Sequence, residues 1–541
     1  MEPNENEMQP NVKKGGGTVL LIVLAVLAVL AVAFCIYCAT TSMKGKVNDD
    51  VSLVLYDGPT TLLTKDEALA QFDPDLEKYK KTLAKETDTK IYVGNEELFV
   101  YATGVAAGHT WSVDYTAPQM YTPVTYFDAE FKNGGEVTIC VDITDVEEIE
   151  NIESVEVLPS SYGIEPKVEG KKVYFNIKET GNYTVVFNDK EVNATHIFVN
   201  DIEDYATNID EDTIVIEPGE WYIENVSIES GNTYYIKGGA VVHTTIGGNF
   251  VEDVKIFGHG IIDGSWYAGW KENNTTEAHV PFNIVSGKGI TLDGLTFLNS
   301  NCWVINATDS NNCIFQNVKL ISGRANGDGI TLQSCQDMVV QNCFVRTWDD
   351  SLVVKNYTTT QNTKNISFKN ISIWTDLAQS MEIGYETNKG KKDDPEISGV
   401  SFSDITVLYN FHKPAISIHN SDNAYVHDIS YKNIVVEHAN MGEGDGAENR
   451  QLIDFNVKSS NWSQTNERGR IKDISIDNVQ VLNTNKANVI SRIVGNDTEH
   501  KVEDVTIKDL VILGTKVTND NCTDAEHQFE FNDYVNNIVF E

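Results

Sequence analysis

The sequence predicts an all-β protein: a right-handed parallel β-helix, preceded by a small β-sandwich domain and an N-terminal transmembrane helix. Three observations support this prediction. A ten-residue phrase recurs through the C-terminal part, strand-like segments precede it, and one uncharged apolar run lies near the N-terminus. The recurring phrase decides the fold class, because a short unit repeated at near-regular intervals is typical of a solenoid whose coils bury their apolar sides against each other.

The apolar run TVLLIVLAVLAVLAVAFCIYCA occupies residues 18–39. It is long enough to cross the hydrocarbon core of a bilayer. It exceeds the apolar part of an ordinary signal peptide, and no small-x-small cleavage site follows it. We therefore interpret it as a signal anchor behind a cytoplasmic tail, residues 1–17. The expected location is the cell membrane, single-pass, with the large part extracellular; if the run is cleaved, the protein is secreted instead.

Two segments separate this run from the repeats. Residues 40–89 are polar and include LTKDEALAQFDPDLEKYKKTLAKE, whose helical periodicity is interrupted at Pro74, so we expect a stalk with helical pieces. Residues 90–205 contain strand-like stretches such as EVTICVDI, KKVYFNI and NYTVVFN, divided by Gly and Asn turns. Such alternation predicts the small β-sandwich.

The β-helix is expected over residues 206–541. Its phrase has the form apolar-x-apolar-x-(Gly/Asn/Asp)-apolar-x-apolar and recurs every 23 to 45 residues, as in ITLDGLTFLN, CIFQNVKLIS, MVVQNCFVRT, ISFKNISIWT and VSFSDITVLY. Between the phrases lies a second short strand in each coil, such as GITLQ, SLVVK, SMEIG and AISIH. Parallel strands of successive coils stack, and alternate residues point inward and outward. The predicted outward rows are Thr331, Val353, Glu382 and Ser417, then Gln333, Lys355, Gly384 and His419.

Three carboxylates stand at matched places just before these second strands. The segments NGDGITL and WDDSLVV align so that Asp328 falls opposite Asp350, with Asp349 one residue earlier. The predicted rim row is Asn301, Asp328, Asp350, Gln379 and Pro414.

Repulsion between neighbouring carboxylates raises the proton affinity of at least one of them. One acid then stays protonated while another stays ionised, a division that suits hydrolysis of a glycosidic bond. Each motif alone is also a common turn cap, but the shared register favours a catalytic site.

The stretches NSNCWVI and NGDGITLQSCQDMVVQNCFVRTWDDSLVVK resemble family 28 glycoside hydrolases, the polygalacturonases. ISIWTDLAQSMEIGYET and AISIHNSDNA are more similar to the related dextranase family 49. The resemblance implies that Asp349 is the general acid, that Asp328 and Asp350 hold and deprotonate the attacking water, and that the anomeric carbon is inverted.

Two departures concern the substrate. Gln379 stands where polygalacturonases carry the histidine of a Gly-His-Gly box, and an Arg-Ile-Lys box that binds the substrate carboxylate has no counterpart. The chain has 80 acidic and 41 basic residues, a formal charge of −39, which repels a polyanion at long range. Lys355 is the one cation on the predicted rows near the acids. These observations favour a neutral glycan, although an acidic surface also simply keeps an exported protein soluble.

The remaining candidates are substrate-binding residues. Lys355, Glu382, Gln379 and His419 lie on the predicted rows beside the acids. Trp348 precedes the acid pair and either stacks on a sugar or covers the end of the core. No metal site, cofactor or nucleic-acid partner is expected, and the catalytic domain is expected to be monomeric, with a carbohydrate polymer or oligosaccharide as its partner and the membrane contacted through the anchor.

Two other functions remain open from the sequence. A pectate-lyase-like enzyme shares the β-helix but needs a calcium site beside a basic residue, for which Lys355 is the only candidate. A non-catalytic glycan-binding or adhesive β-helix would suit the N-terminal anchor.

Overall fold

The computed structural model describes residues 46–48, 50–70, 83–106, 109, 119–202, 208–267, 277–444, 446–485 and 488–541. The predicted anchor, residues 18–39, and the tail before it lie outside these ranges. Across the described part of the chain, no helix is both long and apolar enough to span a membrane. The one α-helix within it is the short α2 (Lys65–Ala70), in which Thr64 and Glu67 bond reciprocally at the N-terminus.

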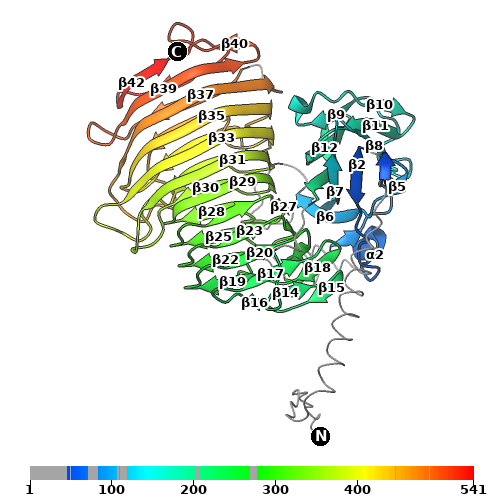
Figure 1. Cartoon of the computed structure of the whole chain (residues 1–541). Helices are drawn as coiled ribbons and strands as arrows, with labels where there is room; N and C mark the ends of the chain where they lie inside the picture. The colour runs from blue at the N-terminus through cyan, green and yellow to red at the C-terminus, as the bar shows by residue number, and fades with distance from the viewer. Residues whose placement is uncertain are drawn as a thin grey trace, which may run out of the picture.

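Two sheets precede the β-helix (Figure 1). The larger contains β1 (Lys46–Asn48), β2 (Val51–Val54), β3 (Ala84–Lys85), β6 (Tyr101–Ala106), β7 (Gln119–Phe131), β9 (Val155–Leu158), β12 (Gly181–Phe187) and β13 (Lys190–Asp201). The smaller contains β4 (Lys90–Val93), β5 (Glu96–Glu97), β8 (Val137–Asp142), β10 (Lys167–Glu169) and β11 (Lys172–Ile177). The 3-10 helix η1 (Ser160–Tyr162) follows β9. One apolar cluster joins both sheets, so they pack as a sandwich.

The sandwich takes in residues that the sequence placed in a stalk. Strand β2 pairs antiparallel with β7, and its side chains Val51 and Leu53 are buried in the core between the two sheets. The stretch VSLV alternates with the strand period, but four residues are too short to outweigh the polar segment that follows. The expected stalk, residues 40–89, is therefore corrected at this strand.

The β-helix consists of two long sheets whose successive coils stack in parallel from the green end to the red end of Figure 1. The 18-stranded sheet contains β14 (Ile214–Ile216), β15 (Gly219–Tyr222), β17 (Thr233–Ile236), β18 (Ala240–His243), β20 (Lys255–Phe257), β21 (Ile261–Asp263), β23 (Thr291–Asp293), β24 (Thr296–Leu298), β26 (Ile314–Gln316), β27 (Lys319–Ser322), β29 (Gln336–Thr347), β31 (Thr363–Thr375), β33 (Glu396–Asn410), β35 (Tyr425–Ala439), β37 (Arg470–Asn483), β39 (Val502–Ile512), β40 (Thr515–Lys516) and β42 (Val535–Phe540).

The 11-stranded sheet supplies the second strand of each coil. It contains β16 (Val226–Ser227), β19 (Ile246–Asn249), β22 (Phe282–Val285), β25 (Ile305–Thr308), β28 (Ile330–Gln333), β30 (Leu352–Lys355), β32 (Met381–Tyr385), β34 (Ile416–Asn420), β36 (Gln451–Val457), β38 (Ile490–Val494) and β41 (Phe529–Phe531). All its pairings are parallel, from β16 with β19 to β38 with β41. The predicted all-β class and parallel β-helix are therefore confirmed.

The turn residue of the repeated phrase explains the bend inside the larger sheet. Asn342, Asn370 and Asn433 have φ between 52° and 56°, a conformation that asparagine tolerates better than most residues. Their side chains also bond along the stack, since Asn370 Nδ2 donates to Asn342 Oδ1 at 2.9 Å and Asn433 Nδ2 to Asp404 Oδ1 at 2.9 Å. The phrase thus specifies both the bend and the coil-to-coil register.

Apolar residues of the phrase fill the interior of the solenoid. Phe368, Phe402 and Tyr431 lie in the same place of consecutive coils, with ring centroids 4.9 and 5.0 Å apart and planes within 6°. All three side chains are fully buried. Such a stacked column ties each coil to the next through packing as well as through the strand ladder.

The sandwich packs directly on the β-helix. A shared apolar cluster contains Tyr126 and Phe198 from the sandwich, and Phe344, Trp374 and Leu408 from the larger sheet of the helix. A smaller cluster joins Ala106, at the end of β6, to Ala325, Trp348 and Leu377 in the turns between the two sheets. The sandwich therefore lies against the side of the solenoid that leads into these turns.

Candidate active site

Each coil crosses from the larger to the smaller sheet through a turn, and the three aspartates stand at the ends of two such turns. Ile330 pairs with Leu352 between β28 and β30, so Asp328 and Asp350, each two residues earlier, are in register. The Gly329 N–H donates to the Asp350 carbonyl at 2.8 Å, which fixes this alignment. The register that the apolar alternation predicts is the one in the structure.

The rim row differs from its prediction at one place. From Asp350 the row runs to Gln379 and then to Pro414, as predicted. The residue after each rim position donates its N–H to the rim carbonyl of the next coil, Ser351 to Gln379 at 2.8 Å and Ser380 to Pro414 at 3.3 Å. On the N-terminal side, Ile305 pairs with Ile330, which puts Trp303 and not Asn301 beside Asp328. The turn before β25 holds two residues more than the alignment assumed.

Burial and mutual repulsion change the acidity of this site. Asp328 and Asp350 are only 5% and 9% exposed, whereas Asp349 is half-buried. Burial, and then the charge of Asp349, raise the pKa of Asp350 to about 7. The same two causes raise the pKa of Asp328 well above its ordinary value. The site therefore retains a proton near neutral pH, as the sequence predicted for neighbouring carboxylates.

The direction of these shifts bears on the roles that the resemblance implies. The carboxyls with raised pKa are Asp328 and Asp350, the pair expected to act on water. In the unliganded protein both of these buried carboxyls favour the protonated form. Because the two groups interact, loss of a proton from one raises the proton affinity of the other.

The acid pair is held by main-chain donors. The Asp350 N–H donates to Asp349 Oδ1 at 3.0 Å, and the Gln379 N–H, one coil later, donates to Asp350 Oδ1 at 3.0 Å. The Gln379 side chain is fully buried; its Nε2 donates to the hydroxyl of Tyr385 at 3.2 Å. Among the described residues, none is a hydrogen-bond partner of its Oε1. Gln379 therefore supports the site through its backbone, with one acceptor unused.

Lys355 is placed on the acid side, as predicted. Its Nζ lies 2.9 Å from Glu386, and the side chain is 10% exposed. Burial alone would lower the pKa of Lys355, but Glu386, Asp328 and Asp350 together raise it above the ordinary lysine value. The ammonium group in turn opposes the rise in the pKa of Asp328 that burial and Asp349 cause. Lys355 thus remains charged and favours the ionised form of Asp328.

Glu382 and His419, both predicted to bind substrate, bind each other. His419 Nδ1 lies 2.9 Å from Glu382 and its Nε2 lies 3.1 Å from Asp454. Ser417 also donates to Glu382. Burial opposes protonation, but Glu382 and Asp454 raise the pKa of His419 to about 10. Glu382 is fully buried, and both ring nitrogens of His419 are occupied.

The same network continues C-terminally. Arg492 Nε and Nη2 bind Asp454 at 3.0 and 2.5 Å, and these interactions, with His419, hold the pKa of Asp454 below its usual range despite burial. The ring of Tyr385 stacks on His419, with centroids 4.4 Å apart and planes 9° apart. Negative and positive side chains therefore alternate in this network, from Glu382 through His419 and Asp454 to Arg492.

Trp348 does not lie open beside the acids. It is 3% exposed and packs with Ala106, Ala325 and Leu377. The predicted sugar-stacking role is corrected accordingly, because the sandwich covers this turn and leaves no indole face exposed. Its position matches the other interpretation given from the sequence, in which the tryptophan covers the end of the core.

Several residues near the acids were missed from the sequence. Lys413 lowers the pKa of Asp350, so Lys355 is not the one cation beside the acids. The alternation of LIDFN, residues 452–456, extends the outward row to Asp454, and the next coil extends it to Arg492, which pairs with Asp454 in the smaller sheet. Trp303, Tyr385 and Glu386 lie in turns or at strand ends, where alternation gives no signal.

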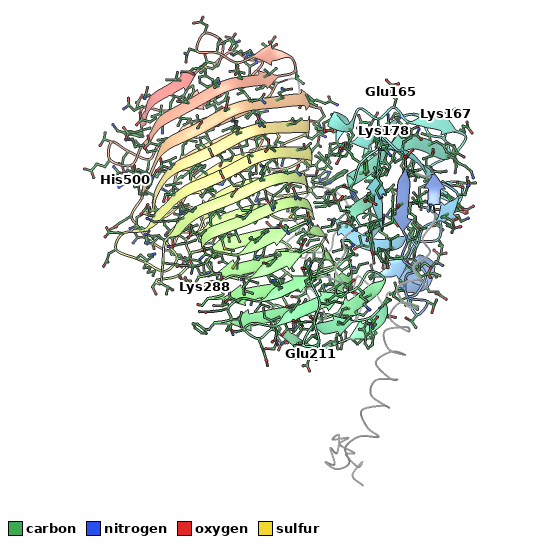
Figure 2. All side chains as sticks on the ribbon, in the orientation of Figure 1. Glu165, Lys167, Lys178, Glu211, Lys288 and His500 are labelled. Atoms are coloured by element: carbon green, nitrogen blue, oxygen red, sulfur yellow. The ribbon has the colours of Figure 1, made fainter. Side chains whose placement is uncertain are left out.

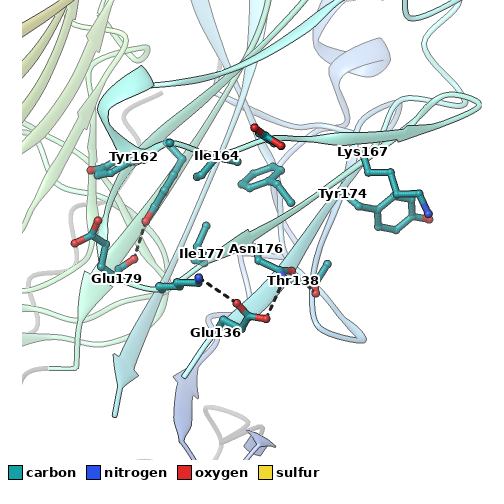
Figure 3. Close-up of a pocket in the computed structure, with 14 residues that line it drawn as sticks. Glu136, Thr138, Tyr162, Ile164, Lys167, Tyr174, Asn176, Ile177 and Glu179 are labelled. Carbon is teal, nitrogen blue, oxygen red and sulfur yellow. Dashed lines mark hydrogen bonds and ion pairs between the residues drawn. The ribbon is translucent and has the colours of Figure 1, made fainter. Parts of the chain in front are cut away.

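A pocket of about 470 Å³ lies elsewhere, in the sandwich (Figure 3). Its lining includes Glu136, Tyr162, Lys178, Glu179 and Tyr183, with Lys178 Nζ 3.6 Å from Glu136. Figure 2 places the nearby Glu165, Lys167 and Lys178 on the sandwich, while Lys288 and His500 lie on the opposite side of the β-helix. These pocket side chains include no buried, interacting carboxyls, so we place the candidate active site at the acid turns.

Comparison with known proteins agrees with this fold. The family model for glycosyl hydrolases family 28 matches residues 223–530. A curated relative, the probable exopolygalacturonase B of Aspergillus terreus, is 24% identical over 258 residues, which cover 43% of this chain and 55% of that protein. The chain thus spans about half the length of the curated relative it matches.

Among solved structures, Dex49A from Penicillium minioluteum is similar with a TM-score of 0.58 at 13% sequence identity. The match covers 91% of this chain and 99% of that one, so the likeness of fold includes the sandwich as well as the β-helix. Since the family model spans more than half of the chain, the protein belongs to glycosyl hydrolases family 28.

Proposed function

We propose that this protein is an inverting glycoside hydrolase that cleaves bonds within a polysaccharide or oligosaccharide at the turns bearing Asp328, Asp349 and Asp350. The main supporting observation is the register of Asp328 with Asp350 on adjacent coils, together with the raised pKa of both groups. Carboxyls held close together on adjacent coils can divide the acid and base roles that glycosidic hydrolysis requires.

In the proposed mechanism, Asp349 donates a proton to the glycosidic oxygen as the bond to the leaving sugar breaks. Asp328 and Asp350 orient a water molecule and remove its proton as its oxygen attacks the anomeric carbon from the opposite face. The product is the inverted hemiacetal. Asp349 is the most exposed of the three, which suits direct contact with a leaving group.

This assignment requires the retained proton to move within the site. In the unliganded protein burial and the charge of Asp349 raise the pKa of Asp328 and Asp350, so that both favour the protonated form. Binding of a sugar over Asp349 removes water from that carboxyl, and desolvation raises the pKa of an acid. The proton then passes to Asp349, and Lys355 stabilises the carboxylate that Asp328 becomes.

A neutral glycan is the first candidate substrate. Three cations near the acids form ion pairs within the protein. Lys355 binds Glu386, His419 binds Glu382 and Asp454, and Arg492 binds Asp454. With a formal charge of −39, the chain disfavours a polyanion at long range. Polygalacturonate is the second candidate, favoured by the name of the curated relative.

The test is a screen of dextran, other neutral polysaccharides and polygalacturonate with the soluble fragment that begins near Val51, followed by Asp349→Asn. We expect the variant to reduce turnover by about 10²- to 10⁴-fold and proton NMR of the fresh product to show the inverted anomer. Asp428→Asn, an exposed carboxylate that is 66% accessible, is the matched control. Unchanged turnover in Asp349→Asn would refute the assignment.

The two alternatives give different results. A lyase releases an unsaturated sugar that absorbs in the near ultraviolet, and its activity is lost in chelator and restored by calcium. Within the described ranges, no three His, Cys, Asp or Glu side chains form a group that could hold a metal ion. An adhesive β-helix would bind a glycan without releasing product.

A further inference from the structure

A set of aromatic side chains leads away from the acids toward the N-terminal coils. Trp303 stands in register with Asp328, one coil earlier, and is partly exposed. Further along the same series of turns lie Tyr267, His279 and Trp266, and the end of strand β15 adds Tyr222. We call these five residues the aromatic strip: Tyr222, Trp266, Tyr267, His279 and Trp303.

The outer part of the strip forms a corner open to solvent. Tyr222 is 61% exposed and Trp266 42% exposed. Their ring centroids lie 5.6 Å apart with planes at 90°. One face of Tyr222 stacks on His243, at 4.3 Å and 18°, so that the opposite face points outward beside the indole.

This corner is held rigidly from beneath. The Tyr222 hydroxyl donates to Glu220 at 2.8 Å, and His243 bridges Glu220 and Asp263 at 3.0 and 2.8 Å. Glu220 and Asp263 are nearly buried. A large exposed aromatic ring with a fixed base is prepared to bind, because little side-chain freedom remains to be lost.

The inner part of the strip is bonded to the acid turn itself. Arg324, four residues before Asp328, donates from Nη1 to the Tyr267 carbonyl at 2.9 Å. The His279 N–H donates to Asn301 Oδ1, in the turn of Trp303, at 2.6 Å. His279 also stacks on Tyr267 at 3.9 Å and 12°. These bonds tie the strip to the acid turn.

The spacing of the coils gives the length of this surface. Parallel strands lie about 4.8 Å apart, so the coil of Tyr267 is about 10 Å from that of Asp328, and Tyr222 lies two coils beyond. Pyranose rings have apolar faces that pack on aromatic rings. On the C-terminal side of the acids, by contrast, the outward side chains Glu382, His419 and Asp454 are buried and bind one another.

We infer that the aromatic strip is a glycan-binding surface that seats several consecutive sugars of the substrate on the N-terminal side of the bond to be cleaved. This inference rests on the proposed function for its link to cleavage, although binding by the strip does not require turnover. It implies that the preferred substrate is longer than a disaccharide. The ligand is a chain of pyranose sugars, recognised chiefly through ring faces.

The test measures binding calorimetrically with the inactive Asp349→Asn protein. The probes are isomaltose and isomaltohexaose, and digalacturonate and hexagalacturonate. We expect a hexasaccharide of one series to bind, and Trp266→Ala or Tyr222→Ala to weaken it about tenfold without changing the weaker binding of the disaccharide. Trp462→Ala is the matched control, since this tryptophan is 52% exposed. Its neighbour Ser463 donates to the carbonyl of Ser421, which follows β34 at the other end of the strands.

The inference is overturned if neither hexasaccharide binds, if the strip variants bind as tightly as the reference, or if Trp462→Ala loses as much affinity. Turnover separates this result from the proposed function. If hydrolysis is insensitive to the strip variants, the proposed hydrolase stands and the inference about the strip fails. If binding depends on Trp266 but the protein hydrolyses none of the polysaccharides, the inference about the strip stands and the proposed hydrolase fails.

Discussion

The main-chain N–H of Gln379 donates to Oδ1 of Asp350 at 3.0 Å, so a carboxylate of one coil is held by the backbone of the next. This bond favours the ionised form of Asp350, yet burial and the neighbouring Asp349 outweigh it and raise the pKa to about 7. The site therefore keeps a carboxyl that titrates near neutrality, at a cost to the stability of the fold.

That cost predicts the behaviour of Asp350→Asn. Below the unfolded pKa, near 3.8, both states are protonated; as the pH rises to about 7 the unfolded state loses a proton that the folded state retains, so folding stability falls. The variant removes this loss. We expect nearly equal stability at pH 4 and a gain of about 4 kcal/mol at pH 8, measured by urea unfolding. A variant less stable than the parent at pH 8 would contradict the shift.

His419→Gln is predicted to act in the opposite direction. The raised pKa of His419, about 10 instead of 6.5, contributes stability that is complete below pH 6.5 and is lost as the pH rises through 10. The variant leaves Glu382 and Asp454 without this cation. We expect a loss of about 3 kcal/mol at pH 6 that shrinks toward pH 10.

The control for this variant is His500→Gln. His500 binds Asp497 at 2.8 Å but is 31% exposed, on the side of the β-helix away from the sandwich (Figure 2). It should change stability little. Equal losses in the two variants at pH 6 would show that the buried network has no special effect.

Lys355→Met tests the electrostatic support of the acids. Lys355 lowers the pKa of Asp328, so its removal should raise that pKa further. If Asp328 acts on water as an ionised group, the acidic limb of the kcat/KM profile moves to higher pH and kcat falls about 10- to 100-fold. Lys288→Met, an exposed lysine on the far side (Figure 2), should leave the profile in place. A lower kcat with an unmoved profile would indicate a structural role alone.

Phe402→Ala tests the stacked core of the solenoid. Phe402 is fully buried between Phe368 and Tyr431, with centroids 4.9 and 5.0 Å away. Loss of both ring contacts, and the cavity that results, should reduce the free energy of unfolding by about 3–5 kcal/mol. Chemical denaturation measures it, with Phe402→Leu as the milder comparison. A loss below 1 kcal/mol would mean that the coils are held by the strand ladder alone.

The repeat predicted the β-helix because the residues of each ten-residue phrase determine the strands and the turn of that phrase. Alternation gives the strands, and residues such as Asn342 and Asn370 supply the left-handed bend. The same regularity placed Asp328 beside Asp350. It failed where a turn changed length: Trp303 took the place predicted for Asn301, and no periodic signal marks an irregular turn.

The contacts between segments that are distant in the sequence could not be predicted from its local alternation. Trp348 is covered because the sandwich residue Ala106 packs on it, and a sequence gives no measure of such docking. Lys413 and Arg492 come from later coils, beyond long and variable loops. Glu382 and His419 were placed on the correct rows, but their pairing with each other and with Asp454 depends on side-chain directions.

The shared apolar cluster between sandwich and solenoid has a consequence for the solubility of the β-helix. A chain that began at residue 208 would present Phe344, Trp374 and Leu408 to water, a patch that favours aggregation. The sandwich therefore shields the apolar side of the solenoid from water, and a fragment that contains the solenoid alone is expected to aggregate where the two-part chain stays in solution.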